Sequence, residues 1–99
     1  MDLLETHVRA ADPVFVENRA AYLKLVEQLR AEHAKAKRGG SDSAVARHRA
    51  RGKLLPRERI EKICDPGSPF LELSALAAHG MYGGDAPSAG IVTGIGSIH

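Results

Sequence analysis

The sequence predicts an α+β fold in which helices come first and strands follow. Two observations carry this prediction: apolar residues recur at helical spacing after Asp12-Pro13, whereas strand-like runs appear only after residue 69. A chain of 99 residues buries only about 60–65% of its unfolded surface, and this one has no tryptophan to anchor a core. The core must therefore be thin.

The first helix is predicted to begin at Asp12-Pro13, because aspartate caps free backbone N–H groups and proline fits the first helical position. It is expected to end at Gly39-Gly40, after basic residues that suit the negative end of the helix dipole. The helical spacing places one set of residues on a single face: Phe15, Tyr22, Val26, Leu29 and His33. This face needs a packing partner.

A second, shorter helix is predicted between two loops. Ser41 or Ser43 caps its start, because a serine hydroxyl accepts a hydrogen bond from a free N–H of the first turn. The helix runs towards Arg51, and Gly52 is its left-handed stop. Its apolar face is weak.

A third helix is predicted from Pro56 to Cys64, where the sequence Asp65-Pro66-Gly67-Ser68 favours a turn. The three helices form a predicted helical arm over residues 12–64. Residues 1–11 are expected to be a flexible N-terminus.

Two strands are predicted in the C-terminal third. Phe70–Leu73 is a short candidate, and residues 74–90 read as a loop with at most a helical turn. Ile91–Ile98 is a longer candidate whose alternate residues share a face. Because no later strand follows it, we expect its partner to be another chain, or the whole to be the front part of something larger.

Composition excludes several classes of protein. A single cysteine, Cys64, excludes an internal disulfide and fits a reducing compartment. No apolar run approaches the roughly 20 residues that span a bilayer. The opening residues resemble neither a secretory signal nor a transit peptide, so we expect a cytoplasmic protein, or a matrix protein if the source is eukaryotic and imports it.

Charge is concentrated in one segment. Residues 1–46 are neutral, residues 47–62 carry seven bases against two acids, and residues 63–99 carry three acids and no lysine or arginine. The concentration indicates a place where an anion or an acidic surface docks. Its bases are Arg47, Arg49, Arg51, Lys53, Arg57, Arg59 and Lys62.

The alternative interpretation of this segment is a solvated helix face with local ion pairs to Glu58 and Glu61. Against it, guanidinium and ammonium groups around a helix junction can surround a phosphate. Nucleic acid stays a runner-up, because the segment has no aromatic side chain on which bases could stack.

No catalytic or metal-binding constellation is found. Gly94–His99 begins like a dinucleotide fingerprint, but His99 stands at the third glycine position, and the glycines are better explained by a close backbone approach. Cys64 is interpreted as a small core residue rather than a nucleophile. The histidines share no ligand spacing, so no metal is expected: they are His7, His33, His48, His79 and His99.

The run Arg51–Ile60, RGKLLPRERI, followed by Asp65–Ser68, resembles the N-terminal signature of biotin-dependent acyl-CoA carboxylase β subunits, the carboxyltransferase component. Ser68–Gly83, SPFLELSALAAHGMYG, resembles in particular the methylcrotonoyl-CoA carboxylase members, with geranoyl-CoA carboxylases as close neighbours. Gly90–Gly96 resembles the family's entry into its first core strands. The resemblance covers most of the chain from about Ala11 onward.

This resemblance implies a crotonase-like (ClpP/crotonase) fold, of which residues 65–99 are the incomplete start. It implies transfer of a carboxyl group from carboxybiotin to 3-methylcrotonoyl-CoA in leucine breakdown. Its implied partners are the acyl-CoA substrate, an α subunit that provides biotin carboxylase and carries the biotin, and further β subunits; no biotin is expected on this chain. Family subunits are several hundred residues long, so no catalytic residue is carried over and the 99 residues alone are expected to be inactive.

Three residues are carried over as candidate contacts to the phosphates of coenzyme A: Arg51, Lys53 and Arg57. The same residues can equally fasten the helical arm to the core or to a neighbouring subunit. A non-catalytic fragment that docks on carboxylase subunits, and a small basic nucleic-acid-binding module, remain the alternatives from other classes.

Overall fold

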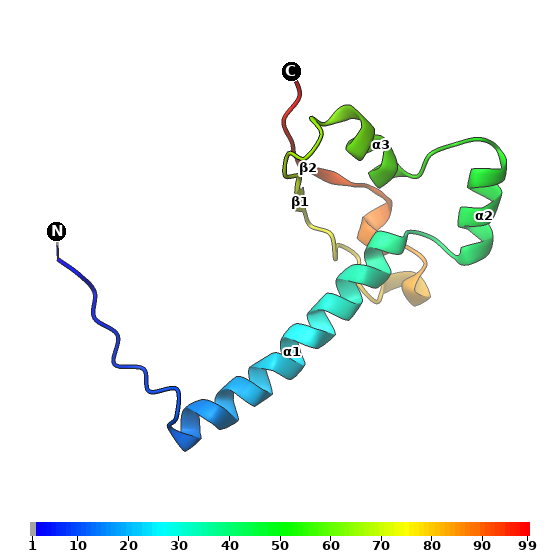
Figure 1. The fold of residues 1–99 in the computed structure, drawn as a ribbon. Helices are drawn as coiled ribbons and strands as arrows, with labels where there is room; N and C mark the ends of the chain where they lie inside the picture. Colours follow the sequence, from blue (N-terminus) through cyan, green and yellow to red (C-terminus); the bar gives the residue numbers. More distant parts are fainter. Residues whose placement is uncertain (1) are drawn as a thin grey trace. The chain divides into compact units, whose positions relative to one another are not determined.

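The computed structural model describes residues 2–99, and these divide into two compact units, one up to Ala31 and one over Glu32–His99. Helices come before strands along the chain, as predicted (Figure 1). The elements in chain order are α1 (Pro13–Arg38), α2 (Asp42–Ala50), α3 (Pro56–Ile63), β1 (Leu71–Leu73), the 3₁₀ segments η1 (Met81–Gly84) and η2 (Pro87–Gly90), and β2 (Thr93–Ile95).

Local signals determine both ends of α1. The Asp12 Oδ1 atom accepts a hydrogen bond from the Val14 N–H at 2.9 Å, which satisfies one of the free donors of the first turn. At the other end Gly39 takes the left-handed conformation, with φ of 85°, that a residue with a side chain rarely adopts. The predicted start and stop of this helix are confirmed.

Helix α2 is capped by Ser41 and not by Ser43. The Ser41 Oγ atom accepts from the Ala44 N–H at 3.3 Å, and the Ser43 hydroxyl lies 3.1 Å from it. The chain leaves the helix through Gly52, whose φ of 71° is left-handed as predicted. The turn predicted after α3 is also present, since the Ser68 N–H donates to the Asp65 carbonyl at 3.0 Å.

The apolar side chains at the end of the third helix are only partly covered. Ile63 is 63% exposed, whereas Cys64 is half-buried at the end of α3. A Cβ atom added at Gly96 would lie 2.7 Å from the Cys64 sulfur, so the thiol packs directly against that glycine. Cys64 is a packing residue in this part of the chain.

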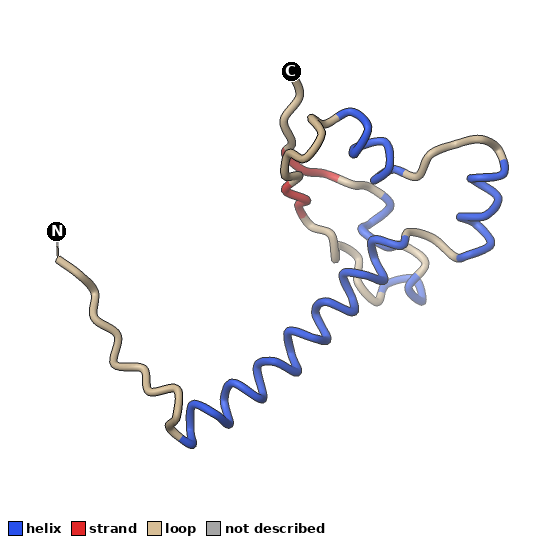
Figure 2. The backbone as a smooth tube through the Cα atoms, in the orientation of Figure 1, coloured by secondary structure: helices blue, strands red, loops and turns tan. Residues whose placement is uncertain are grey.

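The strands form a two-stranded antiparallel sheet (Figure 2). In its register Leu71 lies opposite Ile95, Glu72 opposite Gly94, and Leu73 opposite Thr93. Two expectations are thereby corrected. The strand expected over 91–98 is only three residues long, and its partner is β1 of the same chain rather than a second molecule.

The sheet is short because the backbone turns away at both ends of the ladder. Ser74 follows β1 in a left-handed conformation with φ of 54°, so no partner remains for Ile91 and Val92. Beyond Ile95, the Asp65 N–H takes the Ser97 carbonyl as its acceptor at 2.9 Å. After β2, Ser97 is therefore hydrogen-bonded to the turn that follows α3 instead of continuing the strand ladder.

Gly94 in β2 and Gly96 just after it make room for one aromatic ring. A Cβ atom on Gly94 would fall against the Phe70 ring and 2.5 Å from the Leu71 carbonyl oxygen. A Cβ atom on Gly96 would lie 3.1 Å from the same ring. The explanation of these glycines as sites of close backbone approach is confirmed.

Arg57 joins four segments of the second unit. Its Nε donates to both Glu72 carboxylate oxygens, at 3.1 and 3.2 Å, and its Nη2 donates to Glu72 and, at 3.0 Å, to the Ser88 hydroxyl. Its Nη1 donates to the Ala36 and Lys37 carbonyls at 3.4 and 3.3 Å. An arginine has five N–H donors, and all five are used here.

This Arg57 cluster lies at the centre of what little core there is. The Glu72 side chain is 12% exposed, and the Arg57 guanidinium that donates to it holds the pKa of the Glu72 carboxyl below its usual range. The buried Ser88 hydroxyl donates a hydrogen bond to the Ala75 carbonyl at 2.8 Å. Ala36 and Ala75 are the buried hydrophobic residues of the described chain.

We predict that Gly94→Ala lowers the free energy of unfolding by about 1–3 kcal/mol, because the added methyl group has no room beside Phe70 and the Leu71 carbonyl. Gly40→Ala is the matched control, since its Cβ would meet only the Ala44 methyl at an ordinary 3.6 Å. Urea unfolding followed by circular dichroism measures both. Equal midpoints for the two variants would contradict the close packing of the ring on Gly94.

We predict that Glu72→Gln costs about 1.5–3 kcal/mol at pH 7, because the charge-assisted hydrogen bonds to Arg57 are lost. The lowered pKa means that this stabilisation is present above the ordinary carboxyl value of 4.5 and is lost as pH falls through the lowered value. The unfolding midpoints of the wild type and the variant, measured at pH 7, 4.5 and 3, should converge as the pH falls. Glu61→Gln, at an exposed position of α3, should leave the pH dependence unchanged.

Candidate functional site

The junction between α2 and α3 presents the segment Arg51–Leu55, here called the basic loop. Backbone hydrogen bonds fix its first half: the Gly52 N–H donates to the Arg49 carbonyl at 2.9 Å, and the Lys53 N–H reaches the His48 carbonyl at 3.4 Å. The His48 Nε2 atom lies 2.9 Å from the Leu54 carbonyl oxygen. The loop is thus held by the helix that precedes it.

Glu58 fixes the other end of the basic loop. Its carboxylate accepts from the Leu55 N–H at 2.7 Å, which caps the start of α3, and its second oxygen pairs with Arg49 Nη2 at 2.7 Å. The hydrogen bond from Leu55, with the nearby Arg49 charge, lowers the pKa of the Glu58 carboxyl. Arg49 is therefore occupied by a local ion pair, as the solvated-face interpretation expected of this segment.

The three candidate phosphate contacts have different environments. Arg51 and Lys53 flank Gly52, are exposed, and make no ion pair within residues 2–99. Arg57 is half-buried and gives every donor to the chain itself. The structure therefore leaves two of the three cationic groups free for a ligand, and Arg57 is not free in this arrangement.

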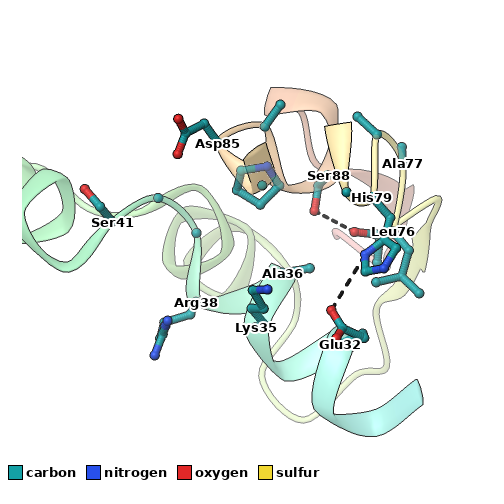
Figure 3. Close-up of a pocket in the computed structure, with 18 of the residues that line it drawn as sticks. Glu32, Lys35, Ala36, Arg38, Ser41, Leu76, Ala77, His79, Asp85 and Ser88 are labelled. Atoms are coloured by element: carbon teal, nitrogen blue, oxygen red, sulfur yellow. Dashed lines mark hydrogen bonds and ion pairs between the residues drawn. The ribbon is translucent and has the colours of Figure 1, made fainter. Parts of the chain in front are cut away.

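A hollow of about 610 Å³ opens in the second unit, away from the basic loop (Figure 3). Its floor consists of small residues that include the buried Ala36, Ala75 and Ser88. Ionisable side chains stand around it: Glu32, Lys35, Arg38, His79 and Asp85. The two carboxylates offset the charges of Lys35 and Arg38, so the hollow has no strong preference for one sign of charge.

The hollow does not contain a nucleophile with a base. The Ser88 hydroxyl is held between Arg57 and the Ala75 carbonyl, and Ser41 caps α2. His79 faces Glu32 at 3.7 Å across the rim (Figure 3), but neither lies in a hydrogen bond with a serine or cysteine. The structure assigns no catalytic residue here.

Backbone strain accompanies this hollow. Several residues other than glycine take left-handed conformations along the loop: Ser74, Ala78, Tyr82, Ser88 and Ala89. Such conformations persist only where the surroundings determine them, and the Ala89 N–H is indeed fixed on the Ala77 carbonyl at 3.0 Å. The loop is held in one arrangement by its own hydrogen bonds and by the Arg57 cluster.

Sequence reasoning missed Glu72 and Ser88 as partners of Arg57. Glu72 carried a signal, because an acid between two leucines on a predicted strand occupies the face opposite to theirs and needs a cation if that face is covered. Ser88 carried none, since it stands in a segment rich in glycine and alanine. Their sequence distances from Arg57, 15 and 31 residues, exceed any helical or turn spacing.

Within residues 2–99 no group of three metal-ligating side chains comes together. No helix in the same range combines the length and the apolar character needed to cross a bilayer.

Comparisons of the sequence and of the structure with known proteins both match carboxylase beta subunits. The family model for the carboxyl transferase domain matches residues 47–99. Over 75 residues, 76% of this chain, it is 57% identical to the biotin-dependent 3-methylcrotonyl-coenzyme A carboxylase beta1 subunit of Mycobacterium tuberculosis. Over 86% of the chain it is 52% identical to the mitochondrial methylcrotonoyl-CoA carboxylase beta chain of Arabidopsis thaliana. The match spans 14% of each relative.

A solved structure covers nearly all of the fold. The beta subunit of the P. aeruginosa geranyl-CoA carboxylase matches 96% of this chain with a TM-score of 0.75 and 35% identity, and the match spans 18% of that subunit. The predicted resemblance to carboxyltransferase subunits is thus confirmed in both sequence and structure, with RGKLLPRERI inside the matched segment. This chain belongs to the carboxyl transferase domain family.

Proposed function

We propose that this chain is the N-terminal part of the carboxyltransferase (β) subunit of a methylcrotonoyl-CoA carboxylase, the enzyme that moves a carboxyl group from carboxybiotin to 3-methylcrotonoyl-CoA. The observation that carries the proposal is the 57% identity over 75 residues with a 3-methylcrotonyl-coenzyme A carboxylase subunit. The structural neighbour acts on geranyl-CoA, so geranoyl-CoA is the alternative substrate.

The exposed face of the sheet supports a role as part of a larger domain. Leu71, Leu73 and Ile95 lie on one face and are 60%, 47% and 64% exposed. A two-stranded sheet is marginally stable alone, and its apolar face normally packs against further structure. We therefore expect the 99 residues to lack activity until a crotonase-like domain is completed around them.

The basic loop is the part of this chain that we assign to substrate. Coenzyme A carries a 3′-phosphate and a pyrophosphate, and the free guanidinium and ammonium groups of Arg51 and Lys53 suit such anions. The anchors at His48 and Glu58 limit the conformational entropy that the loop would lose on binding. Arg57 holds the fold that carries the loop and is not assigned to the phosphates.

Biotin is assigned to no residue of this chain. We propose that an α subunit carries the biotin and supplies its carboxylation, and that further β subunits complete the assembly. The proposed compartment is the cytoplasm, or the mitochondrial matrix in a eukaryote.

We predict that residues 1–99 can replace the matching segment of the M. tuberculosis carboxylase beta1 subunit with retention of activity. The hybrid subunit, purified with its α subunit, is assayed for biotin-dependent carboxylation of 3-methylcrotonoyl-CoA and of geranoyl-CoA. The beta1 subunit without this segment is the negative control. A hybrid that assembles with its α subunit and carboxylates neither substrate would contradict the proposal.

We predict that Arg51→Ala with Lys53→Ala raises the KM for acyl-CoA of that hybrid about tenfold or more and leaves kcat nearly unchanged, because binding to the phosphates is uniform along the reaction. The same substitutions should have no effect on an acyl-pantetheine thioester, which has no such phosphates. Arg47→Gln, on the exposed side of α2, is the control base. An equal loss with both substrates would mean that the loop acts structurally.

A further inference from the structure

The first unit contains a helix with an uncovered apolar face. Between Pro13 and Ala31, α1 extends over about 28 Å, at 1.5 Å per residue. At 100° per residue, one set of side chains covers about 120° of its circumference. The set is called the α1 stripe and consists of Val14, Phe15, Tyr22, Leu25, Val26 and Leu29.

Four of the six residues of the α1 stripe are exposed in the described chain, and the other two, Phe15 and Val26, are half-buried. Tyr22 is 69% exposed, Leu25 57% and Leu29 50%, although these residues share the face of the helix that is most apolar. Isolated exposed apolar residues are ordinary, but a contiguous stripe of this kind marks a surface that another structure covers. The pattern and the charges of α1 bear on which structure covers the stripe.

The pattern of α1 disfavours a second copy of the helix. Two-stranded coiled coils need a narrow seam with apolar residues at every first and fourth position of a heptad. If Phe15, Tyr22 and Leu29 occupy the first position, the fourth position holds Asn18, Leu25 and Glu32, so two of the three are polar. A stripe about 120° wide is typical of a helix on a broad globular surface.

The charges of α1 disfavour a lipid surface. Helices that lie on membranes carry lysine and arginine on their polar face. Here two acids are mixed with three bases over the same length: Glu17, Arg19, Lys24, Glu27 and Arg30. The polar face is therefore nearly neutral and suits water beside a protein interface.

The structural match indicates which structure covers the α1 stripe. The P. aeruginosa subunit matches 96% of this chain, so it contains a counterpart of nearly all the described elements, and the match uses only 18% of that subunit. The other four-fifths, roughly, are the rest of that subunit. A body of this size offers the broad surface that the width of the stripe requires.

We propose that the α1 stripe docks on the body of a carboxyl transferase domain, meaning the part of that domain that residues 1–99 do not span. The inference rests on the proposed function and adds that α1 holds this segment on the domain through apolar burial. The basic loop is then presented from a segment anchored at both of its units, one by α1 and one by the sheet.

The test measures binding of residues 1–99 to the P. aeruginosa subunit from which the matching segment has been removed. Isothermal titration should give a one-to-one complex. Leu25→Gln with Leu29→Gln should weaken the complex roughly tenfold to a hundredfold for each leucine that becomes buried. Leu23→Gln is the matched control, because Leu23 lies about 120° from the middle of the stripe and should change the affinity less than threefold.

A hybrid subunit covers the case in which the truncated body does not fold. Residues 1–99 replace the matching segment of the complete P. aeruginosa subunit, and thermal unfolding is compared for the same variants. The Leu25 and Leu29 pair should lower the midpoint, and Leu23→Gln should not. Equal effects of the two variants, or a dimer of residues 1–99 that the Leu25 and Leu29 pair disrupts, would overturn the proposal.

The two proposals fail separately in this hybrid. If the hybrid is active and the Leu25 and Leu29 substitutions do not change its unfolding midpoint, the docking proposal is overturned and the proposed function stands. If the hybrid is inactive and only the Leu25 and Leu29 substitutions lower its unfolding midpoint, the proposed function is overturned and the docking proposal stands.

Discussion

The second unit depends on the interaction between Arg57 and Glu72. At the end of α1 the Ala36 carbonyl accepts from the Gly39 N–H, and Arg57 donates to this carbonyl and to that of Lys37. The same guanidinium also donates to the Glu72 carboxylate of β1. Because Ala36 and Ala75 are the only buried hydrophobic residues among residues 2–99, hydrophobic burial alone offers little to define this arrangement. A charged group with five directed donors provides the geometry that a larger core would otherwise provide.

The loop before β2 follows from the same constraint. Ser88 has a left-handed backbone conformation, which costs free energy for a residue with a side chain. This conformation is retained because the Ser88 hydroxyl accepts a hydrogen bond from Arg57 and donates one to the Ala75 carbonyl. The turn after β1 and the loop before β2 are thereby joined. The short register of the sheet is a consequence, since Ser74 turns the backbone away as soon as Leu73 has paired.

Sequence reasoning worked where the cause of structure is local. Asp12-Pro13 and Gly39 bound α1 because capping and left-handed glycine act within one turn, and the glycines of β2 signalled a close approach. It failed where the cause is distant. The length of β2 depends on where β1 stops and on the Asp65 N–H, and the role of Arg57 depends on Glu72 and Ser88, which no periodicity relates to it.

The bases of the segment Arg51–Ile60 differ in whether their donors are already used by the fold. RGKLLPRERI contains bases of two kinds: Arg57 is consumed by the fold, whereas Arg51 and Lys53 stand exposed around Gly52. A base whose donors are satisfied internally has little free energy to gain from a phosphate, because each new hydrogen bond replaces an existing one. The anchors of Glu58 and His48 keep the two free bases on a fixed backbone. The same ten residues thus combine a structural arginine with the two bases of the proposed anion site, and only the hydrogen-bond partners separate the two roles.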